Sequence, residues 1–147
     1  MIELRDITPD NHLEVRSLSV HPEQTRFVAD VDKSLADAFV WRDALARAAY
    51  HQGAAVGFVM IFPYSEAGVS HVNIVRLMIA AEHQGIGLGR QLLAETLLWI
   101  DALSPDRIRI STLPDNETAL RLYRSFGFVE NGVEDGEIAL YLDKTET

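Results

Sequence analysis

Cysteine does not occur in this sequence of 147 residues. Its absence excludes disulfide bonds, thiolate zinc sites and a cysteine nucleophile. A basic surface is lacking too, since 13 Lys and Arg residues stand against 22 Asp and Glu residues, a formal net charge of −9. Such a chain repels a phosphodiester backbone, which argues against nucleic acid as a partner. The excess of carboxylates suits cationic ligands, although it also serves solubility alone.

Long apolar runs are also missing. No stretch of the sequence approaches the ~20 apolar residues that span a bilayer, which argues against a membrane protein. The first ten residues, MIELRDITPD, have no basic region followed by an apolar run, so we do not expect a signal peptide. The length is close to the commonest domain size and the composition is ordinary for a globular protein. We therefore predict one domain over residues 1–147, located in the cytoplasm.

Hydrophobic patterns predict strands that alternate with helices. We expect strands at residues 2–6, 44–50, 54–62, 69–80, 107–112, 128–132 and 137–142. We expect helices at residues 9–18, within 21–40, at 88–103 and after Asn116. Pro63 is expected to end its strand, because proline cannot donate to a ladder. This order predicts an α/β fold, a mixed sheet with helices on its faces.

Three glycines, at positions 85, 87 and 89, lie between the apolar strand 69–80 and the helix that follows. Glycines let the chain turn sharply and leave backbone amides exposed, and the positive end of the helix dipole adds to them. Together they predict a phosphate site, to which Arg90 adds charge. The spacing fits neither the dinucleotide motif G-x-G-x-x-G nor the Gly-Lys-Ser/Thr of a P-loop. A glycine-rich turn without a ligand is the remaining alternative.

Two motifs in this region resemble those of the GNAT superfamily of N-acetyltransferases. The segment Gln84-Gly85-Ile86-Gly87-Leu88-Gly89, preceded by Arg76-Leu77-Met78-Ile79, resembles the family motif Q/R-x-x-G-x-G/A. The segment Asn116-x-x-Ala119-x-x-Leu122-Tyr123-x-x-Phe126-Gly127-Phe128 resembles the motif that follows it. The resemblance covers roughly residues 73–142. It implies a largely antiparallel twisted sheet flanked by helices, with acetyl-CoA in a splay between two central parallel strands.

The resemblance also implies which residues bind acetyl-CoA. Its pantetheine would contact the backbone of the strand before the loop, at Leu77, Met78 and Ile79. Its pyrophosphate would bind the loop amides of Gln84, Gly85, Ile86, Gly87, Leu88, Gly89 and Arg90. Asn116 would contact the cofactor arm, and Tyr123 would face the sulfur.

Acetyl transfer to an amine needs a neutral amine, donors for the oxyanion and a proton for the departing thiolate. Tyr123 could supply that proton, since an unperturbed phenol has a pKa near ~10. Its alternative role is that of a core aromatic at helical spacing. With no cysteine to form an acyl-enzyme, direct attack by the amine in a ternary complex is favoured.

The sequence does not assign the group that deprotonates the amine. Many members of the family use a Glu on the strand before the loop, but here that strand carries His71, Asn73 and Arg76. His71, Glu66 and deprotonation through water stay open as alternatives. The five histidines show neither i,i+4 nor paired spacing, so we expect no metal.

Residues 18–38 and the tail Glu134-Asp135-Gly136-Glu137-Ile138 look similar to bacterial spermine/spermidine (diamine) acetyltransferases. This resemblance implies a small cationic amine as the acceptor. Carboxylates that could pair with its ammonium groups, or that simply lie on a solvated surface, are Glu23, Asp30, Asp32, Asp37 and Glu137.

Two other functions stay open: acetylation of another small amine or of a protein amino terminus, and a non-catalytic acyl-CoA-binding regulatory module. The oligomeric state is open as well. Leu98 and Trp99 lie off the main apolar face of their helix, which indicates either a second packed surface or a homodimer contact.

Overall fold

The computed structural model describes residues 1–144, in which seven strands form one sheet in the order β1-β2-β3-β4-β5-β7-β6. Neighbouring strands are antiparallel except β4 and β5, which are parallel. The strands are β1 (Ile2–Asp6), β2 (Leu45–His51), β3 (Ala54–Glu66), β4 (Val69–Ile79), β5 (Arg107–Thr112), β6 (Val129–Glu134) and β7 (Glu137–Asp143). The helices are α1 (His12–Arg16), α2 (Val31–Val40), α3 (Leu88–Asp101) and α4 (Glu117–Ser125), with short 3-10 turns at Pro22–Gln24 and Ala81–His83.

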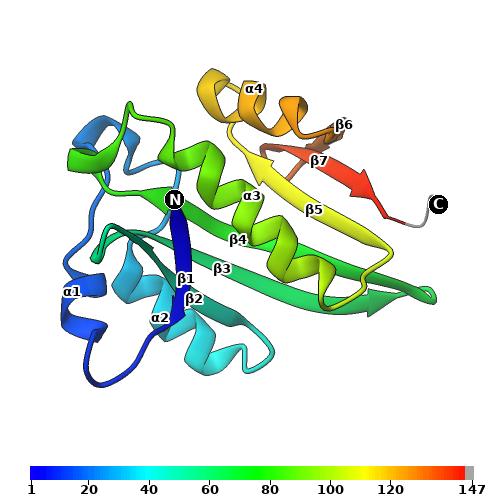
Figure 1. Cartoon of the computed structure of the whole chain (residues 1–147). Helices are drawn as coiled ribbons and strands as arrows, with labels where there is room; N and C mark the ends of the chain where they lie inside the picture. Colours follow the sequence, from blue (N-terminus) through cyan, green and yellow to red (C-terminus); the bar gives the residue numbers. More distant parts are fainter. Residues whose placement is uncertain (145–147) are drawn as a thin grey trace.

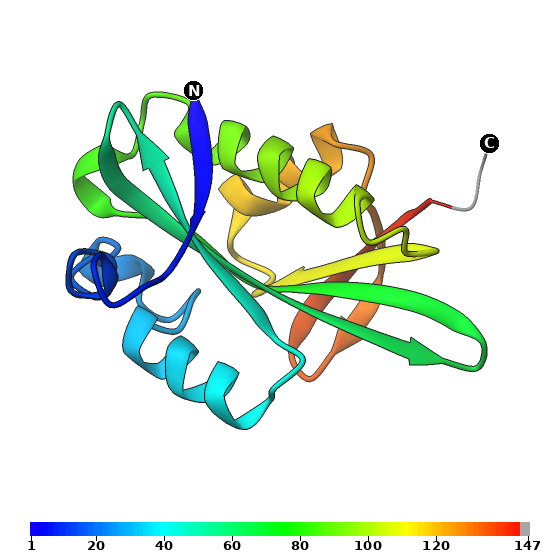
Figure 2. The same cartoon turned by 60° about the horizontal axis from the view of Figure 1, so that its bottom comes forward.

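Helices lie on both faces of the sheet (Figure 1). Figure 2 shows α3 and α4 on one face and α1 and α2 on the other. On their face of the sheet, α1 and α2 pack against β2 and β3. On that face β5 and β7 lie to one side of these two helices. No helix within residues 1–144 is long and apolar enough to cross a membrane.

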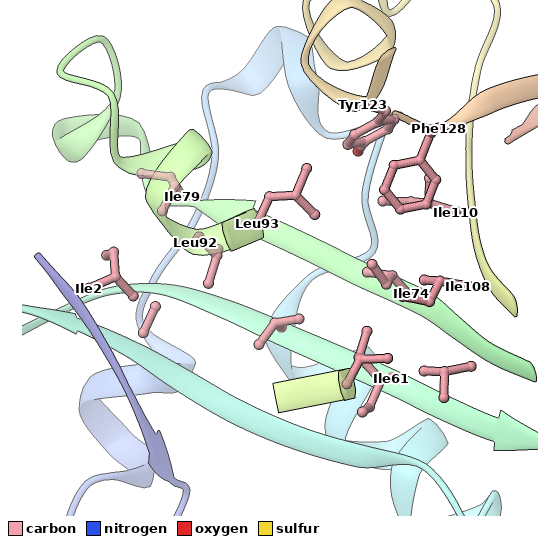
Figure 3. Packing of buried hydrophobic residues seen from close by; sticks show 14 of the residues in the cluster. Ile2, Ile61, Ile74, Ile79, Leu92, Leu93, Ile108, Ile110, Tyr123 and Phe128 are labelled. Carbon is pink, nitrogen blue, oxygen red and sulfur yellow. The ribbon is translucent and has the colours of Figure 1, made fainter. Parts of the chain in front are cut away.

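The main apolar core lies between the sheet and the pair α3 and α4. Figure 3 shows Leu92 and Leu93 of α3 above Ile61, Ile74 and Ile108 of the sheet. Side chains of these residues are almost completely removed from water, at 0–4% exposure. Their burial fixes which face of each strand turns towards α3 and α4.

The fold class predicted from the sequence is confirmed. The observed order of strands and helices matches the predicted order, and the sheet is mixed and largely antiparallel with helices on its faces. The central parallel pair is also present, formed by β4 and β5.

Two local predictions were wrong. Pro63 does not end its strand, because β3 continues to Glu66 and Pro63 pairs with Val72. Pairing of β3 with β2 ends at Ile61, so Pro63 lies where β3 has one free edge and a missing donor is tolerated. The helix expected at residues 9–18 is only His12–Arg16, because the Asn11 side chain accepts from the Thr8 amide at 2.7 Å and holds a turn there.

A bulge in β4 ends its pairing with β5. Met60 pairs with Arg76 and Ile61 with Ile74, so Val75 has no partner on β3. The ladder between β4 and β5 runs only as far as the pair Ile74 and Ile110. Because a bulge bends a strand and increases its twist, β4 turns away from β5 at this point. The splay predicted between the two parallel strands is therefore present.

Gly57 allows β3 and β4 to approach closely beyond this bulge. It pairs with Ile79, and a Cβ atom at this position would lie inside van der Waals contact of the Met78 carbonyl oxygen. The clash is with backbone, which cannot move aside as a flexible side chain does. A glycine is therefore required where β4 bends away from β5.

We expect Gly57→Ala to lower the free energy of unfolding by about 1–3 kcal/mol, because the added methyl group overpacks this contact. Gly89→Ala is the matched control, since Gly89 lies in α3 with open space around it. There alanine should stabilise by about 0.5–1 kcal/mol. Urea denaturation of the ligand-free variants measures both changes, and equal stability of the two variants would contradict the role of Gly57.

Candidate active site

A cleft of about 980 Å³ lies where β4 and β5 separate. Its walls come from β4, from the turn before α3, from the end of β5 and from α4. Nearly all residues predicted to bind the cofactor line it, namely Leu77, Met78, Ile79, Gln84, Gly85, Gly87, Leu88, Gly89, Arg90 and Asn116. Ile86 is the exception, and its side chain is 66% exposed. Tyr123 lines the cleft as well. The individual roles of these residues stay predictions.

The β4 wall is an open sheet edge. Beyond Ile74, no residue of β4 pairs with another strand on the β5 side in the described chain. Backbone N–H and C=O groups on that side of Val75–Ile79 therefore face the cleft without strand partners. An extended chain that carries amide groups can pair with such an edge as an added strand does.

The turn before α3 exposes backbone amides. Gly85 and Gly87 have φ values of 87° and 86°, in the left-handed region that favours glycine. Gly87 is the N-cap of α3, and no side chain of the described residues caps the free amides of the first turn. The helix has 14 residues, so its dipole adds a positive potential at this end. These features suit a phosphate group.

The side chain of Gln84 fastens this turn to its surroundings. Its amide nitrogen donates to the Ile79 carbonyl at 2.9 Å and to Gln24 Oε1 at 2.9 Å. Gln24 donates back to Gln84 Oε1 at 3.1 Å. The sequence does not predict this contact of Gln24, because residues 60 positions apart leave no local pattern. The Gln84 side chain is thus occupied in holding the turn, while its backbone remains at the cleft.

Tyr123 is held in place by the C-terminal end of α4. The Phe128 amide donates to the Tyr123 carbonyl at 3.2 Å and the Gly127 amide to Arg124 at 3.0 Å. With φ of 97° at Gly127, this is a left-handed helix ending of the kind that glycine favours. Figure 3 shows the Tyr123 ring beside Phe128 and above Ile110, with ring centroids of Tyr123 and Phe128 6.3 Å apart.

The phenol of Tyr123 is protonated over the physiological range. Its side chain is 7% exposed, and burial, followed by the negative charge of Glu137, raises the pKa of Tyr123 to about 12. A phenol with this pKa is a hydrogen-bond donor rather than a base at neutral pH. No hydrogen bond joins it to another group within residues 1–144, so it is available to a ligand in the cleft.

Asn116 begins α4. Its Oδ1 accepts from the Ala119 amide at 3.4 Å and its Nδ2 donates to Thr112 Oγ1 at 2.9 Å. Asn116 therefore caps the helix and ties it to the end of β5. The cofactor contact assigned to Asn116 by resemblance stays a prediction.

The residues considered for deprotonating the amine do not line the cleft. His71 lies among the paired residues of β4, 7% exposed, with its ring stacked on Tyr64 at 4.8 Å. Glu66 ends β3 at the far hairpin. Arg76 donates to Ser34 and to Asp37, at 3.1 and 3.0 Å, and so fastens β4 to α2.

The carboxylates considered for ammonium binding divide into two groups. Asp30 caps α2 by accepting from the Lys33 amide, Asp32 pairs with Arg16, and Asp37 pairs with Lys33 and Arg76. These three are occupied in the structure of the α1–α2 region. Glu23 lines the cleft, and Glu137 accepts from Ser111, which lines the cleft.

The surface considered for a homodimer is only partly exposed. Leu98 is 63% exposed, while the Trp99 ring is covered by the Arg47 guanidinium at 4.3 Å. Trp99 thus packs within the chain, and the homodimer stays a prediction. The expected absence of a metal also stays a prediction; residues 1–144 contain no group of three His, Asp or Glu side chains arranged for one.

An open strand edge, a turn with free amides and a protonated phenol around one cleft suit an acyl-CoA ligand. Comparison with known proteins identifies the family. The model of the acetyltransferase (GNAT) family matches residues 22–128. The spermine/spermidine N(1)-acetyltransferase of Bacillus subtilis (strain 168) is 32% identical over 139 residues, 91% of each chain. The chain belongs to the GNAT family and is an acetyl-CoA-dependent N-acetyltransferase.

Solved structures agree on the fold. The GNAT domain of S. lividans PAT has a TM-score of 0.77 at 19% identity, over 96% of this chain and 89% of that one. A Bacillus subtilis acetyltransferase in complex with CoA has a TM-score of 0.72 at 22% identity, over 97% of each chain. The seven-stranded sheet with its central parallel pair is therefore a GNAT fold.

We expect Gly87→Ala to weaken CoA binding roughly tenfold or more, because a strained left-handed alanine shifts amides that would bond a charged group. Gly68→Ala is the matched control. Gly68 has φ of 80° and open space around it, like Gly87, but lies in the hairpin between β3 and β4. Calorimetric titration with CoA measures both affinities; equal weakening in the two variants would contradict a phosphate site at Gly87.

Proposed function

We propose that the protein acetylates a primary amine of a polyamine such as spermidine or spermine, by direct attack of the amine on acetyl-CoA in a ternary complex. The relative from Bacillus subtilis, named as a spermine/spermidine N(1)-acetyltransferase, supports this acceptor. The net charge of −9 supports a cationic substrate, since it favours encounter with cations.

The observation that carries the proposal is the open edge of β4 beside the glycine turn and Tyr123. We assign the pantetheine to the backbone of Leu77, Met78 and Ile79, and the pyrophosphate to the amides of residues 84–90. In this assignment the phosphate end of the cofactor lies at the glycine turn and its thioester end lies at Tyr123. A backbone amide of the same β4 edge can donate to the oxyanion of the tetrahedral intermediate.

The reaction needs no covalent acyl-enzyme. The neutral amine attacks the thioester carbon, forming the C–N bond, and collapse of the intermediate breaks the C–S bond. The thiolate takes the phenolic proton of Tyr123, which burial keeps on the oxygen until then. The sequence has no cysteine for a ping-pong route, so both substrates occupy the cleft together.

Incubation with acetyl-CoA and a panel of amines, with detection of the released thiol, tests the function. We expect turnover on spermidine and spermine above that on amino acids, monoamines and a peptide with a free amino terminus. Turnover only on one of those other amines would contradict the polyamine. Binding of CoA without turnover on any amine would instead indicate a non-catalytic module.

We expect Tyr123→Phe to lower kcat by roughly 10²–10⁴, the usual contribution of a positioned general acid. The KM for acetyl-CoA should change little, because the ring stays in the core beside Phe128. Tyr50→Phe is the matched control, since Tyr50 is also buried but bonds Glu14 of α1. Steady-state kinetics of the two variants decide; an unchanged kcat in Tyr123→Phe would remove Tyr123 from the mechanism.

A further inference from the structure

We propose that Glu137, the first residue of β7, accepts the proton of the acceptor's ammonium group. The proposal rests on the proposed function and supplies the one group that the mechanism above leaves unassigned. From the sequence, His71, Glu66 and deprotonation through water were open alternatives, and neither His71 nor Glu66 lines the cleft. The structure brings another carboxylate to the β5 side of the gap.

The backbone of β5 carries this carboxylate to the gap. Ile110 is the last residue of β5 that pairs with β4, and Ser111, the next residue, lines the cleft. Ser111 Oγ donates to Glu137 Oε1 at 2.8 Å. Glu137 is half-buried, and the bond from Ser111 fixes its carboxylate beside the point where the strands separate. A positioned, partly desolvated carboxylate suits the recognition of an ammonium group.

Glu137 and Tyr123 approach the gap from opposite faces of the sheet. Side chains alternate along β5, and Ile108 and Ile110 belong to the core under α3 and α4, together with Tyr123. Ser111 therefore points to the other face, where β5 and β7 lie beyond α1 and α2 (Figure 2). Glu137 is not among the residues that line the cleft, and it reaches the cleft through its bond with Ser111, so an amine that enters from this face passes beside it. The thiolate leaves towards Tyr123 on the covered face.

The two groups are nevertheless close enough to interact. The charge of Glu137 is the second cause, after burial, of the raised pKa of Tyr123. Burial first, and then this negative charge, keep the phenol in its protonated form and so keep the acid ready.

The proton balance is complete with these two groups. The ammonium transfers one proton to Glu137, and the neutral amine attacks the thioester carbon. The C–S bond breaks, and the thiolate takes the Tyr123 proton to give CoA thiol. The nitrogen releases its second proton as the amide forms, and one proton returns to the phenol. The net reaction converts an alkylammonium ion and acetyl-CoA into the amide, CoA thiol and one proton released to water.

Neighbouring carboxylates differ from Glu137 in ways that can be tested. Glu134 accepts from Arg109 and from Tyr141, so its charge is already paired. Glu23 lines the cleft but lies on the exposed turn Pro22–Gln24, whose Gln24 bonds the glycine turn at Gln84. Asp135 is exposed at the tip of the β6–β7 hairpin. Asp135 therefore provides the control variant, and Glu23 is the competing candidate within the cleft.

The test compares Glu137→Gln with Asp135→Asn and Glu23→Gln, using spermidine as the acceptor. Glutamine keeps an oxygen that can accept from Ser111 and removes only the charge. We expect kcat/KM for spermidine to fall roughly 100-fold or more in Glu137→Gln, the scale of general base catalysis. The CoA affinity of that variant should be unchanged. The fall in kcat/KM of Asp135→Asn, outside the cleft, should be less than a tenth as large, and that of Glu23→Gln should be smaller than that of Glu137→Gln.

A pH profile separates proton transfer from a merely structural role. In Glu137→Gln the rate should rise in proportion to the free amine as pH increases. With an acceptor amine of low pKa, which is already neutral at the assay pH, kcat/KM should fall little in Glu137→Gln. Equal losses for amines of high and low pKa, an unchanged kcat/KM, or a larger loss in Glu23→Gln would each overturn the proposal.

A second measurement needs no turnover. An alkaline titration after a rapid pH jump follows the ionisation of the tyrosines by absorbance. The signal that is missing from Tyr123→Phe belongs to the Tyr123 phenol. Glu137→Gln should lower the pKa of this phenol, whereas Asp135→Asn should not. An unshifted phenol overturns the proposed proximity. If the wild type turned over no amine, the proposed function itself would be contradicted. If the wild type and Glu137→Gln were equally active, only the role of Glu137 would be contradicted.

Discussion

The separation of β4 from β5 is the constraint on which the site depends. Two parallel strands normally bond along their full length, and here the ladder stops at Ile74 and Ile110. The unpaired residue Val75 bends β4 at that point, while β4 stays paired with β3 as far as Ile79. The backbone groups released by this bend have no strand partner, although the Val75 and Ile79 carbonyls accept from the side chains of Arg76 and Gln84. The remaining groups can bond a ligand, and a chain with spaced amides can pair with them.

The same separation gives the sheet a passage between its two faces. On one face α3 and α4 supply the exposed amides and the buried phenol of Tyr123. On the other face the ends of β5 and β7 remain beyond α1 and α2. A thioester placed in the gap can therefore be approached from one side and protonated from the other. In the proposed mechanism the acid Tyr123 and the base Glu137 therefore lie on different faces of the sheet and do not bond each other.

Elements with a local signal were predictable from the sequence. The apolar run of β4, the glycines before α3, and the cap and left-handed ending of α4 are each encoded within a few residues. The position of Tyr123 follows from its place in such a motif. The extent of β3 past Pro63 could not be read locally, because it depends on where β2 stops pairing. The partners of Gln84 and Ser111 are 60 and 26 positions away, and no periodicity reports such contacts.

Arg76 fastens β4 to α2. Its guanidinium bonds Ser34 and Asp37 of α2. Ser34 is completely buried, so removing Arg76 would leave its hydroxyl with one partner fewer, and it would also leave Asp37 without one of its two cations. A glutamate at this position would face Asp37 and repel it. Because Arg76 fastens β4 to α2, our proposal takes the proton acceptor from the other side of the gap, where Ser111 of β5 bonds Glu137 of β7.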